Sequence, residues 1–261
     1  MSNLSSTQIQ ALAQDLLAAG NNVLSIPALV DELSVDDAYA VQDAFTVLQQ
    51  ASANRLIGYK MGLTNLAKMK LAGVSEPLKG QLFANMLLEN GSALVLSELI
   101  QPRVEPEIAF VLRDELSGAN LTAVDVINAT EYITTALEIV DSRYHDFKFS
   151  FCAGIADNIC AARLVLGDER LRPEDFDLAN IQVKLCLNQI QQAAGLSSVV
   201  LNNPINSVIA LAKLLNQRGM KIAAGSVIIT GAITDAVSLQ NGDNVRAEFS
   251  QLGSVGFQIV S

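Results

Sequence analysis

The feature that most constrains the fold is an alternation of apolar and polar residues that recurs from about residue 92 onward. Successive side chains of a strand point to opposite faces, so a period of two predicts strands with one face in a core. Ile181, Val183, Leu185 and Leu187 alternate with polar residues in this way. Further strands are predicted over 93–96, 104–112, 137–140, 227–229, 245–249 and 255–259.

Before about residue 55 the apolar residues recur instead at the spacing of an amphipathic helix. Ser6 stands where it can cap a first helix, and Gly20-Asn21-Asn22 is expected to end it. A second helix is predicted after Ser34, because Asp37 three residues later completes a pattern that resembles a capping box. Further helices are expected after Thr122 and after Pro204.

These patterns predict an α+β fold, with a helical N-terminal region over residues 1–75 and a β-rich core over residues 76–261. Repeated glycines after residue 55 indicate a loop-rich connection between the two. Strands and helices do not alternate regularly, and the sequence contains neither G-x-G-x-x-G nor G-x-x-x-x-G-K-[ST]. A doubly wound nucleotide-binding fold is therefore disfavoured.

Composition excludes several classes of protein. Half of the 261 residues are hydrophobic and 17% are charged, which is typical of a globular chain rather than a disordered one. The net charge of −10 disfavours nucleic acid as a partner. No apolar run approaches the roughly 18 residues that span a bilayer, and the first residues do not resemble a signal peptide. We expect a cytoplasmic protein with no membrane partner, whose three cysteines, Cys152, Cys160 and Cys186, are reduced core residues.

Two glutamates stand out in the segment 102–110, which overlaps the strand predicted over 104–112. Glu105 and Glu107 share one face of the strand, and the apolar residues that follow them indicate burial. Buried carboxylates without compensation are costly, and a hard cation such as Mg²⁺ supplies that compensation. The alternative is an exposed strand face with two solvated glutamates.

A third glutamate, Glu138, interrupts the apolar segment 136–141. Such a residue is usually paired with a basic side chain, and Arg143 is a candidate partner. The sharper hypothesis is that Glu105, Glu107 and Glu138 converge on one metal ion.

Lys60 lies between Gly58 and Gly62 in a short segment. It is either an ordinary surface lysine or a group that holds an anionic substrate or stabilises an enolate. His145 is the only histidine, which excludes a histidine-rich zinc site, and its polar surroundings predict a solvated loop residue.

The order of these segments resembles the 2-keto-4-pentenoate hydratase / 4-oxalocrotonate decarboxylase family, within the fumarylacetoacetate hydrolase-like superfamily. The resemblance covers nearly the whole chain. It rests on residues 60–64, 102–110, 136–143, 156–158, 242–243 and 252–255.

The resemblance implies a fold, a cofactor and a class of substrate. It implies a β-rich core behind a helical N-terminal part, and Mg²⁺ or Mn²⁺ held by Glu105, Glu107 and Glu138. Lys60 would be the active-site lysine, in contact with the substrate, and Arg143 a second substrate-binding residue. The implied substrates are 2-oxo or 2-hydroxy-dienoic acids from meta-cleavage of aromatic compounds.

Within this family the sequence is more similar to the decarboxylases. Hydratases usually carry an acid in a Pro-Asp-aromatic-Gly stretch, where this chain has Leu78 in Glu76-Pro77-Leu78-Lys79-Gly80. The stretch 141–149 is similar to the decarboxylase version, and Ala232 replaces a serine expected in many hydratases. Decarboxylation needs chiefly an electron sink, whereas hydration needs a group that positions water and moves protons.

We therefore expect a metal-dependent lyase that decarboxylates 2-oxo-3-hexenedioate. The alternatives are a 2-keto-4-pentenoate hydratase, a non-catalytic partner subunit of that hydratase, a small-acid binding protein and an acylpyruvate hydrolase. The family also implies a homo-oligomer and a complex with the hydratase of the same pathway.

Overall fold

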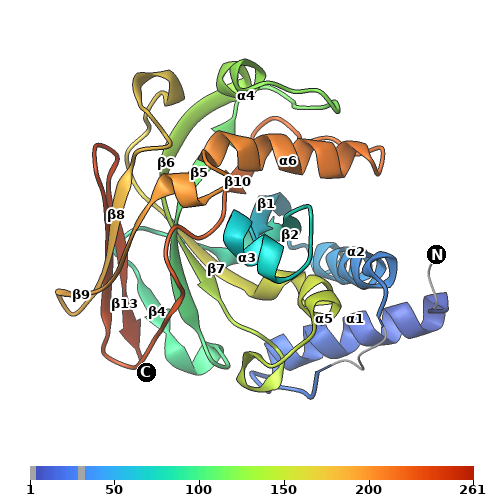
Figure 1. Cartoon of the computed structure of the whole chain (residues 1–261). Coiled ribbons are helices and arrows are strands. Elements are labelled where there is room, and N and C mark those ends of the chain that lie inside the picture. The colour runs from blue at the N-terminus through green and yellow to red at the C-terminus, as the bar shows by residue number, and fades with distance from the viewer. Residues whose placement is uncertain (1–3, 29–32) are drawn as a thin grey trace.

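The computed structural model describes residues 4–28 and 33–261 and contains two β-sheets (Figure 1). Residues 1–3 lie outside the described residues. They belong to the N-terminal stretch that is expected not to be a signal peptide. The strands of the larger sheet are β1 (Leu56–Gly62), β2 (Leu78–Phe83), β3 (Leu87–Leu88), β5 (Arg103–Leu112), β6 (Thr130–Val140), β7 (Ala161–Leu166), β10 (Val227–Ile229) and β11 (Val237–Ser238).

The larger sheet has the strand order β2-β1-β10-β5-β6-β7-β3, and β11 pairs with the start of β5. The smaller sheet has the order β4-β13-β12-β8-β9. Its strands are β4 (Ala93–Val95), β8 (Gln182–Leu187), β9 (Ile190–Leu196), β12 (Asn244–Phe249) and β13 (Gly253–Val260).

The alternation of apolar and polar residues that predicted strands from residue 92 onward matches an alternation of buried and exposed side chains. β8, β12 and β13 bury alternate side chains, and β13 packs against β6 and β7 of the larger sheet. Phe110 and Ile133 of the larger sheet and Leu185 and Phe257 of the smaller one belong to the same buried cluster. The main core therefore lies between the two sheets.

The helices cover the remaining surfaces. α1 (Ser6–Asn21), α2 (Val35–Ala51) and α5 (Phe151–Ala156) pack together and share a second core with the outer face of the larger sheet. α6 (Pro204–Asn216) lies against α4 (Ala123–Ala129) (Figure 1).

The helix starts agree with the predicted caps to within one residue. The first helix is capped by Ser5 rather than Ser6 and ends at Asn22. Ser34 accepts a hydrogen bond from the backbone of Asp37, Thr122 forms a capping box with Asp125, and α6 begins at Pro204 behind Asn203. These caps and the strands confirm the predicted α+β class.

The structure corrects the expectation for residues 55–75. Instead of a loop-rich connection they form β1 and the short helix α3 (Leu66–Leu71). β1 pairs with β2 and with β10, so hydrogen bonding crosses the boundary predicted at residue 75. Gly58 and Gly62 interrupt the apolar alternation of β1, which explains why the sequence pattern did not predict this strand.

The larger sheet curls until its β2 end contacts β7. Asn158, just before β7, closes this approach with two hydrogen bonds to β2. Its Oδ1 accepts from the backbone N–H of Gln81 at 2.7 Å, and its Nδ2 donates to the carbonyl of Gln81 at 2.9 Å. The curl places the side chains of β1, β5 and β6 around one space.

The close approach of β1 to β10 is the first feature to test. A Cβ added to Gly58 would lie 1.8 Å from the carbonyl oxygen of Val227, a backbone atom that cannot move aside. We expect Gly58→Ala to lower the free energy of unfolding by at least about 2 kcal/mol. Urea denaturation followed by circular dichroism measures it.

Gly20→Ala is the matched control, because the nearest atom to its added Cβ is 3.7 Å away. It lies in α1, where alanine is the better helix former, so no loss is expected. Equal midpoints for Gly58→Ala and the unsubstituted protein would show that the two strands can separate without cost.

Candidate active site

Three glutamates converge because β5 and β6 are neighbouring antiparallel strands. Glu105 lies directly opposite Glu138, and Glu107 lies two residues further along β5 on the same face. One carboxylate oxygen of each lies within 4.8 Å of those of the other two. The structure thus brings together the three residues that the sequence singled out as a metal-binding set.

Lys60 reaches this cluster from β1. Its Nζ lies 2.7 Å from Oε2 of Glu138 and donates a 2.9 Å hydrogen bond to the carbonyl oxygen of Ile159. The side chains of Lys60 and Glu138 are only 2% and 1% exposed, so Lys60 is not a surface lysine. The partner of Glu138 is Lys60 and not Arg143, the candidate named from the sequence.

Burial dominates the protonation of the cluster. Desolvation raises the pKa of Glu105 to about 7 against the opposing effect of Lys60, and raises the pKa of Glu107 well above its usual range. The pKa of Glu138 is likewise raised by burial, although Lys60 lowers it. Burial alone lowers the pKa of Lys60, but the three carboxylates outweigh burial and raise it. Lys60 is therefore an ammonium at neutral pH.

The donor set fits a hard divalent cation. Oε1 of Glu107 and Oε1 of Glu138 are buried and accept no hydrogen bond from the described residues. Buried carboxylate oxygens normally have a hydrogen-bond partner. A cluster of three carboxylates supplies the oxygen ligands that Mg²⁺ prefers. The sequence-based expectation of a magnesium-type cofactor agrees with this arrangement.

A backbone N–H orients one of the glutamates. Gly231, which follows β10, donates a 2.6 Å hydrogen bond to Oε2 of Glu107. Gly231 has φ +113°, and a Cβ there would lie 2.1 Å from Oγ1 of Thr64. Only glycine suits this position, which sequence reasoning passed over in favour of its neighbour Ala232.

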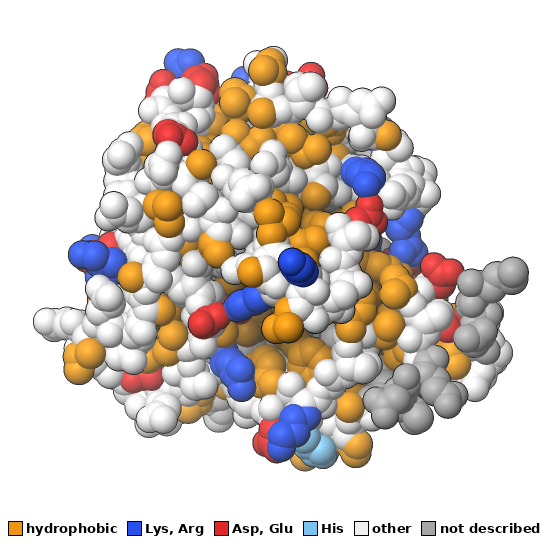
Figure 2. Space-filling model, in the orientation of Figure 1, with side chains coloured by type: hydrophobic (Ala, Val, Ile, Leu, Met, Phe, Trp, Pro, Cys, Tyr) orange, Lys and Arg blue, Asp and Glu red, His pale blue; other side chains and the backbone are white. Residues whose placement is uncertain are grey.

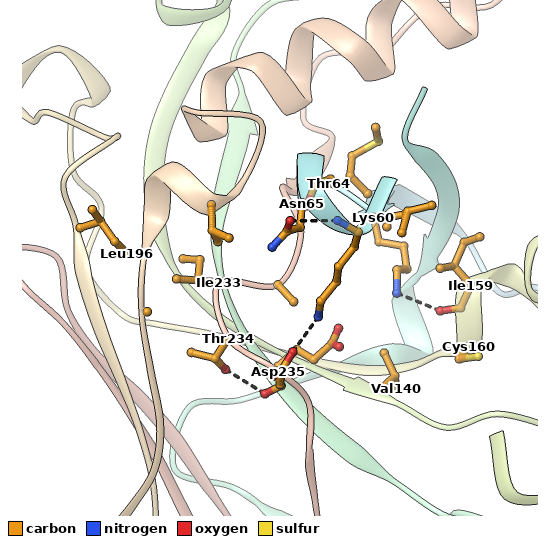
Figure 3. Close-up of a pocket in the computed structure, with 18 of the residues that line it drawn as sticks. Lys60, Thr64, Asn65, Val140, Ile159, Cys160, Leu196, Ile233, Thr234 and Asp235 are labelled. Atoms are coloured by element: carbon orange, nitrogen blue, oxygen red, sulfur yellow. Dashed lines mark hydrogen bonds and ion pairs between the residues drawn. The ribbon is translucent and has the colours of Figure 1, made fainter. Parts of the chain in front are cut away.

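Glu105 and Lys60 line a cavity of about 740 Å³. Figure 2 shows a hollow on this face, with hydrophobic side chains inside it and charged side chains at its edge. Figure 3 shows Ile159 and Val140 on one side of the cavity and Leu196 and Ile233 on the other. Polar lining comes from Thr64, Asn65, Ser198 and Thr234.

A strained turn presents the carbonyl group that holds Lys60. Asn158, Ile159 and Cys160 are three consecutive residues with positive φ, of 51°, 51° and 60°. Non-glycine residues adopt this conformation rarely, and its cost is met here by surrounding contacts such as those of Asn158 with β2. The segment 156–158 contributed to the family resemblance, but no role for Asn158 or Ile159 was derived from the sequence.

The structure places Arg143 away from the cavity. Its Nη1 lies 3.1 Å from Oδ1 of Asp157, its Nη2 donates to the carbonyl of Ala161, and its guanidinium lies over the ring of Phe45. Arg143 is not among the residues that line the cavity, so this arrangement gives no support to the expectation that it binds substrate. The residue follows β6 and supports the chain around Asp157, whose pKa is raised to about 6 by burial despite the nearby arginine.

Other residues singled out in the sequence also find their places. Ala232 lines the cavity, whereas Leu78 pairs with Gly62 across β1 and β2 and is not among the lining residues. His145 is exposed, as expected, with Nδ1 2.6 Å from Oγ of Ser25. All three cysteines are free, but only Cys160 is buried, so Cys152 and Cys186 are not core residues.

Comparison with known proteins identifies the family. The sequence pattern of the fumarylacetoacetate (FAA) hydrolase C-terminal family matches residues 67–260. The chain belongs to the fumarylacetoacetate hydrolase family.

Two full-length relatives and one solved structure show how close they are. The chain is 35% identical to a 4-oxalocrotonate decarboxylase of Pseudomonas putida over 260 residues, covering 98% of each chain. It is 36% identical to 2-keto-4-pentenoate hydratase 1 of Dechloromonas aromatica (strain RCB) over 258 residues, again covering 98% of each. The solved structure is 4-oxalocrotonate decarboxylase from Pseudomonas putida G7 complexed with magnesium and adipate, with TM-score 0.96, 36% identity and 100% of both chains covered.

These relatives confirm the resemblance and the fold, and a magnesium complex among them agrees with the acidic cluster. They include decarboxylases and hydratases at similar identity, so the relatives indicate an enzyme of one of these two kinds without choosing the reaction. Within residues 4–28 and 33–261, none of the helices combines the length and apolar character needed to cross a bilayer.

The raised glutamate pKa values predict how pH and Mg²⁺ affect stability. A carboxyl group whose folded pKa lies above its unfolded value binds more protons when folded, so its contribution is lost as pH rises through the folded pKa. For Glu105 this window runs from about 4.5 to about 7. We expect the metal-free protein to lose stability across this range and Mg²⁺ to restore it.

The measurement is the melting temperature with and without Mg²⁺ at about pH 5.5 and at about pH 8. The increase caused by Mg²⁺ should be larger at the higher pH, because the carboxyl groups must release their protons to bind the cation. Glu105→Gln, with one fewer carboxylate, should show a smaller increase. An increase that is the same at both pH values would contradict the proposed ligands.

Proposed function

We propose that this protein is a magnesium-dependent decarboxylase of 2-oxo-3-hexenedioate, forming 2-hydroxypenta-2,4-dienoate and CO₂ in the meta-cleavage degradation of aromatic compounds. Glu105, Glu107 and Glu138 would hold the Mg²⁺, in agreement with the face that they share and with the unpartnered buried oxygens of Glu107 and Glu138. When bound, the cation would act as a Lewis acid on the 2-oxo group of the substrate.

Lys60 would act on the same oxygen. An ammonium has three N–H donors, of which Glu138 and the carbonyl of Ile159 engage two. Lys60 also lines the cavity, so its third donor is available to a substrate atom. Its raised pKa keeps it charged, and hence a donor, throughout the neutral range.

The reaction balances without an external oxidant or reductant. The bond between C5 and C6 breaks and C6 leaves as CO₂, while its electron pair forms the double bond between C4 and C5. The π electrons between C3 and C4 move to C2–C3, and those of the 2-oxo group move to its oxygen. Lys60 stabilises this oxygen, supplies the proton that completes the 2-hydroxyl group, and regains a proton from water.

The observation that carries the choice of decarboxylation is the inventory of acids and bases around the cavity. Among its described lining residues, the only acidic side chains are Glu105, which belongs to the cluster, and Asp235, which is paired with Lys68. His145 is not among them. A hydratase needs a group free to position water and move its protons, whereas decarboxylation needs the electron sink and Lys60.

Leu78 supports this choice less directly than the sequence suggested. Its side chain is partly buried next to Gly62, which lines the cavity, but Leu78 itself is not a lining residue. Leu78→Asp is therefore expected to affect the reaction only through β1, whereas Ala232 stands in the cavity wall.

The decisive test uses the unmodified protein with Mg²⁺. We expect CO₂ release from 2-oxo-3-hexenedioate, with ultraviolet absorbance reporting the dienol, and no hydration of 2-hydroxypenta-2,4-dienoate. Both substrates are assayed at equal concentrations with trapped CO₂ and 4-hydroxy-2-oxopentanoate as the products measured. Efficient formation of 4-hydroxy-2-oxopentanoate with no CO₂ would identify a hydratase, and neither product would indicate a non-catalytic subunit.

Lys60→Met tests the role of the lysine. Loss of the ammonium that donates to the developing oxygen charge is expected to lower kcat by about a hundredfold or more. Circular dichroism in saturating Mg²⁺ should show that the variant is folded at the assay temperature. Lys70→Met, on exposed α3, is the matched control and should retain full activity. Full activity of Lys60→Met would exclude Lys60 from the reaction.

The proposal extends to the location and the partners of the protein. We infer a cytoplasmic homo-oligomer that associates with the hydratase consuming its product, because the dienol is the substrate of that reaction. Co-purification of the two proteins, compared with each alone by size-exclusion chromatography, tests the association.

A further inference from the structure

An ion pair lies at the edge of the cavity that the proposed chemistry does not use. Nζ of Lys68, on α3, lies 2.6 Å from Oδ1 of Asp235 in the loop after β10. Both residues line the cavity, yet their side chains are 58% and 87% exposed. In Figure 3 one dashed line marks this ion pair at the carboxylate of Asp235. A second dashed line marks the hydrogen bond that the hydroxyl of Thr234 donates to the carbonyl oxygen of Asp235.

The cavity has one other cation among its described lining residues, Lys60. Lys60 is buried and engaged at the carboxylate cluster, whereas Lys68 lies at the solvent-exposed edge. Lys68 is nevertheless within electrostatic reach of the cluster, since its charge acts to lower the pKa of Glu105. Apolar side chains such as Ile233 and Val140 line the same cavity as these two cations.

We propose that Lys68 binds the distal carboxylate of a dicarboxylic substrate by exchanging Asp235 for it, which makes Lys68 the residue that selects dicarboxylates over monocarboxylates. This inference rests on the proposed function only in placing the 2-oxo acid end at Lys60 and the glutamates. The distal end then extends along the apolar wall towards the cavity edge.

A substrate carboxylate can readily displace Asp235 from Lys68 because the ion pair between these two side chains is weak. Two exposed side chains gain little from pairing in water, since solvent screens the charges and both side chains lose freedom. A substrate carboxylate that is also anchored at its other end presents itself to Lys68 at a high effective concentration. Asp235 thus keeps Lys68 directed along the cavity edge without holding it tightly.

The pair also suits a substrate whose distal carboxylate leaves. Lys68 attracts the anion, but CO₂ is neutral and no longer competes with Asp235 for the ammonium. The carboxylate loses its charge as the bond breaks, so this interaction is stronger in the ground state than in the transition state, and loss of Lys68 should raise KM without lowering kcat. Residues that act in the bond-breaking step itself would instead lower kcat.

The test compares two saturated ligands that differ by one carboxylate, 2-oxoadipate and 2-oxohexanoate. Neither has the double bond that conjugates the 2-oxo group with the distal end, so binding is measured without turnover. In the presence of Mg²⁺, calorimetry should show that the unsubstituted protein binds 2-oxoadipate about tenfold more tightly, the effect of one charge-assisted hydrogen bond.

Three variants separate Lys68 from general charge. Lys68→Met should abolish the preference and bind both ligands alike, whereas Lys70→Met on the same helix removes an equal charge and should keep the preference. Asp235→Asn should bind 2-oxoadipate more tightly than the unsubstituted protein, because the competing carboxylate is gone. On 2-oxo-3-hexenedioate, Lys68→Met should raise KM about tenfold without lowering kcat.

The outcomes distinguish this inference from the proposed function. A preference that persists in Lys68→Met, or is absent from the unsubstituted protein, overturns the inference even if CO₂ is released. A preference that depends on Lys68 in a protein releasing no CO₂ supports the inference and refutes the decarboxylase. Weaker binding of 2-oxoadipate by Asp235→Asn would overturn the exchange of partners.

Discussion

Three carboxylates that share one face of two paired, buried strands are the constraint on which the rest of the site depends. Glu105 and Glu138 are cross-strand neighbours, and like charges in that position repel one another and resist desolvation. The ammonium of Lys60 and the N–H of Gly231 compensate part of this cost. The remaining carboxylate oxygens are free to bind a cation. A site of this kind is costly until the cation binds, which links metal binding to folding.

Several irregular features follow from that constraint. β10 is short, and the chain after it bends at Gly231 so that its N–H reaches Glu107. The left-handed turn at 158–160 directs the carbonyl of Ile159 at Lys60, and the contacts of Asn158 and Asp157 hold the turn in place. Unusual backbone conformations therefore lie next to the proposed reacting groups, at Gly231 and in the turn over residues 158–160.

Relatives at similar identity are named as decarboxylases and as hydratases, so family membership does not choose the reaction and the cavity wall is the place to look for that choice. Here that wall is largely apolar and its charged residues are already engaged. The protein as a whole carries a charge of −10, which repels an anionic substrate. Attraction has to be local, and Lys60 and Lys68 provide it at the inner and outer parts of one cavity.

The sequence by itself determined the strands that have a clear period of two, the helix caps and the three glutamates, because these depend on short-range geometry. A period of two places Glu105 and Glu107 on one face whatever the strand pairs with, and a Ser or Thr cap acts within three residues. The tertiary structure decided the rest. Lys60 and Ile159 are 99 residues apart, β1 carried too weak an alternation to be recognised, and Arg143 turned to Asp157 instead of the cavity. Such contacts arise from how the sheet curls and where its strands end, and no local pattern encodes that.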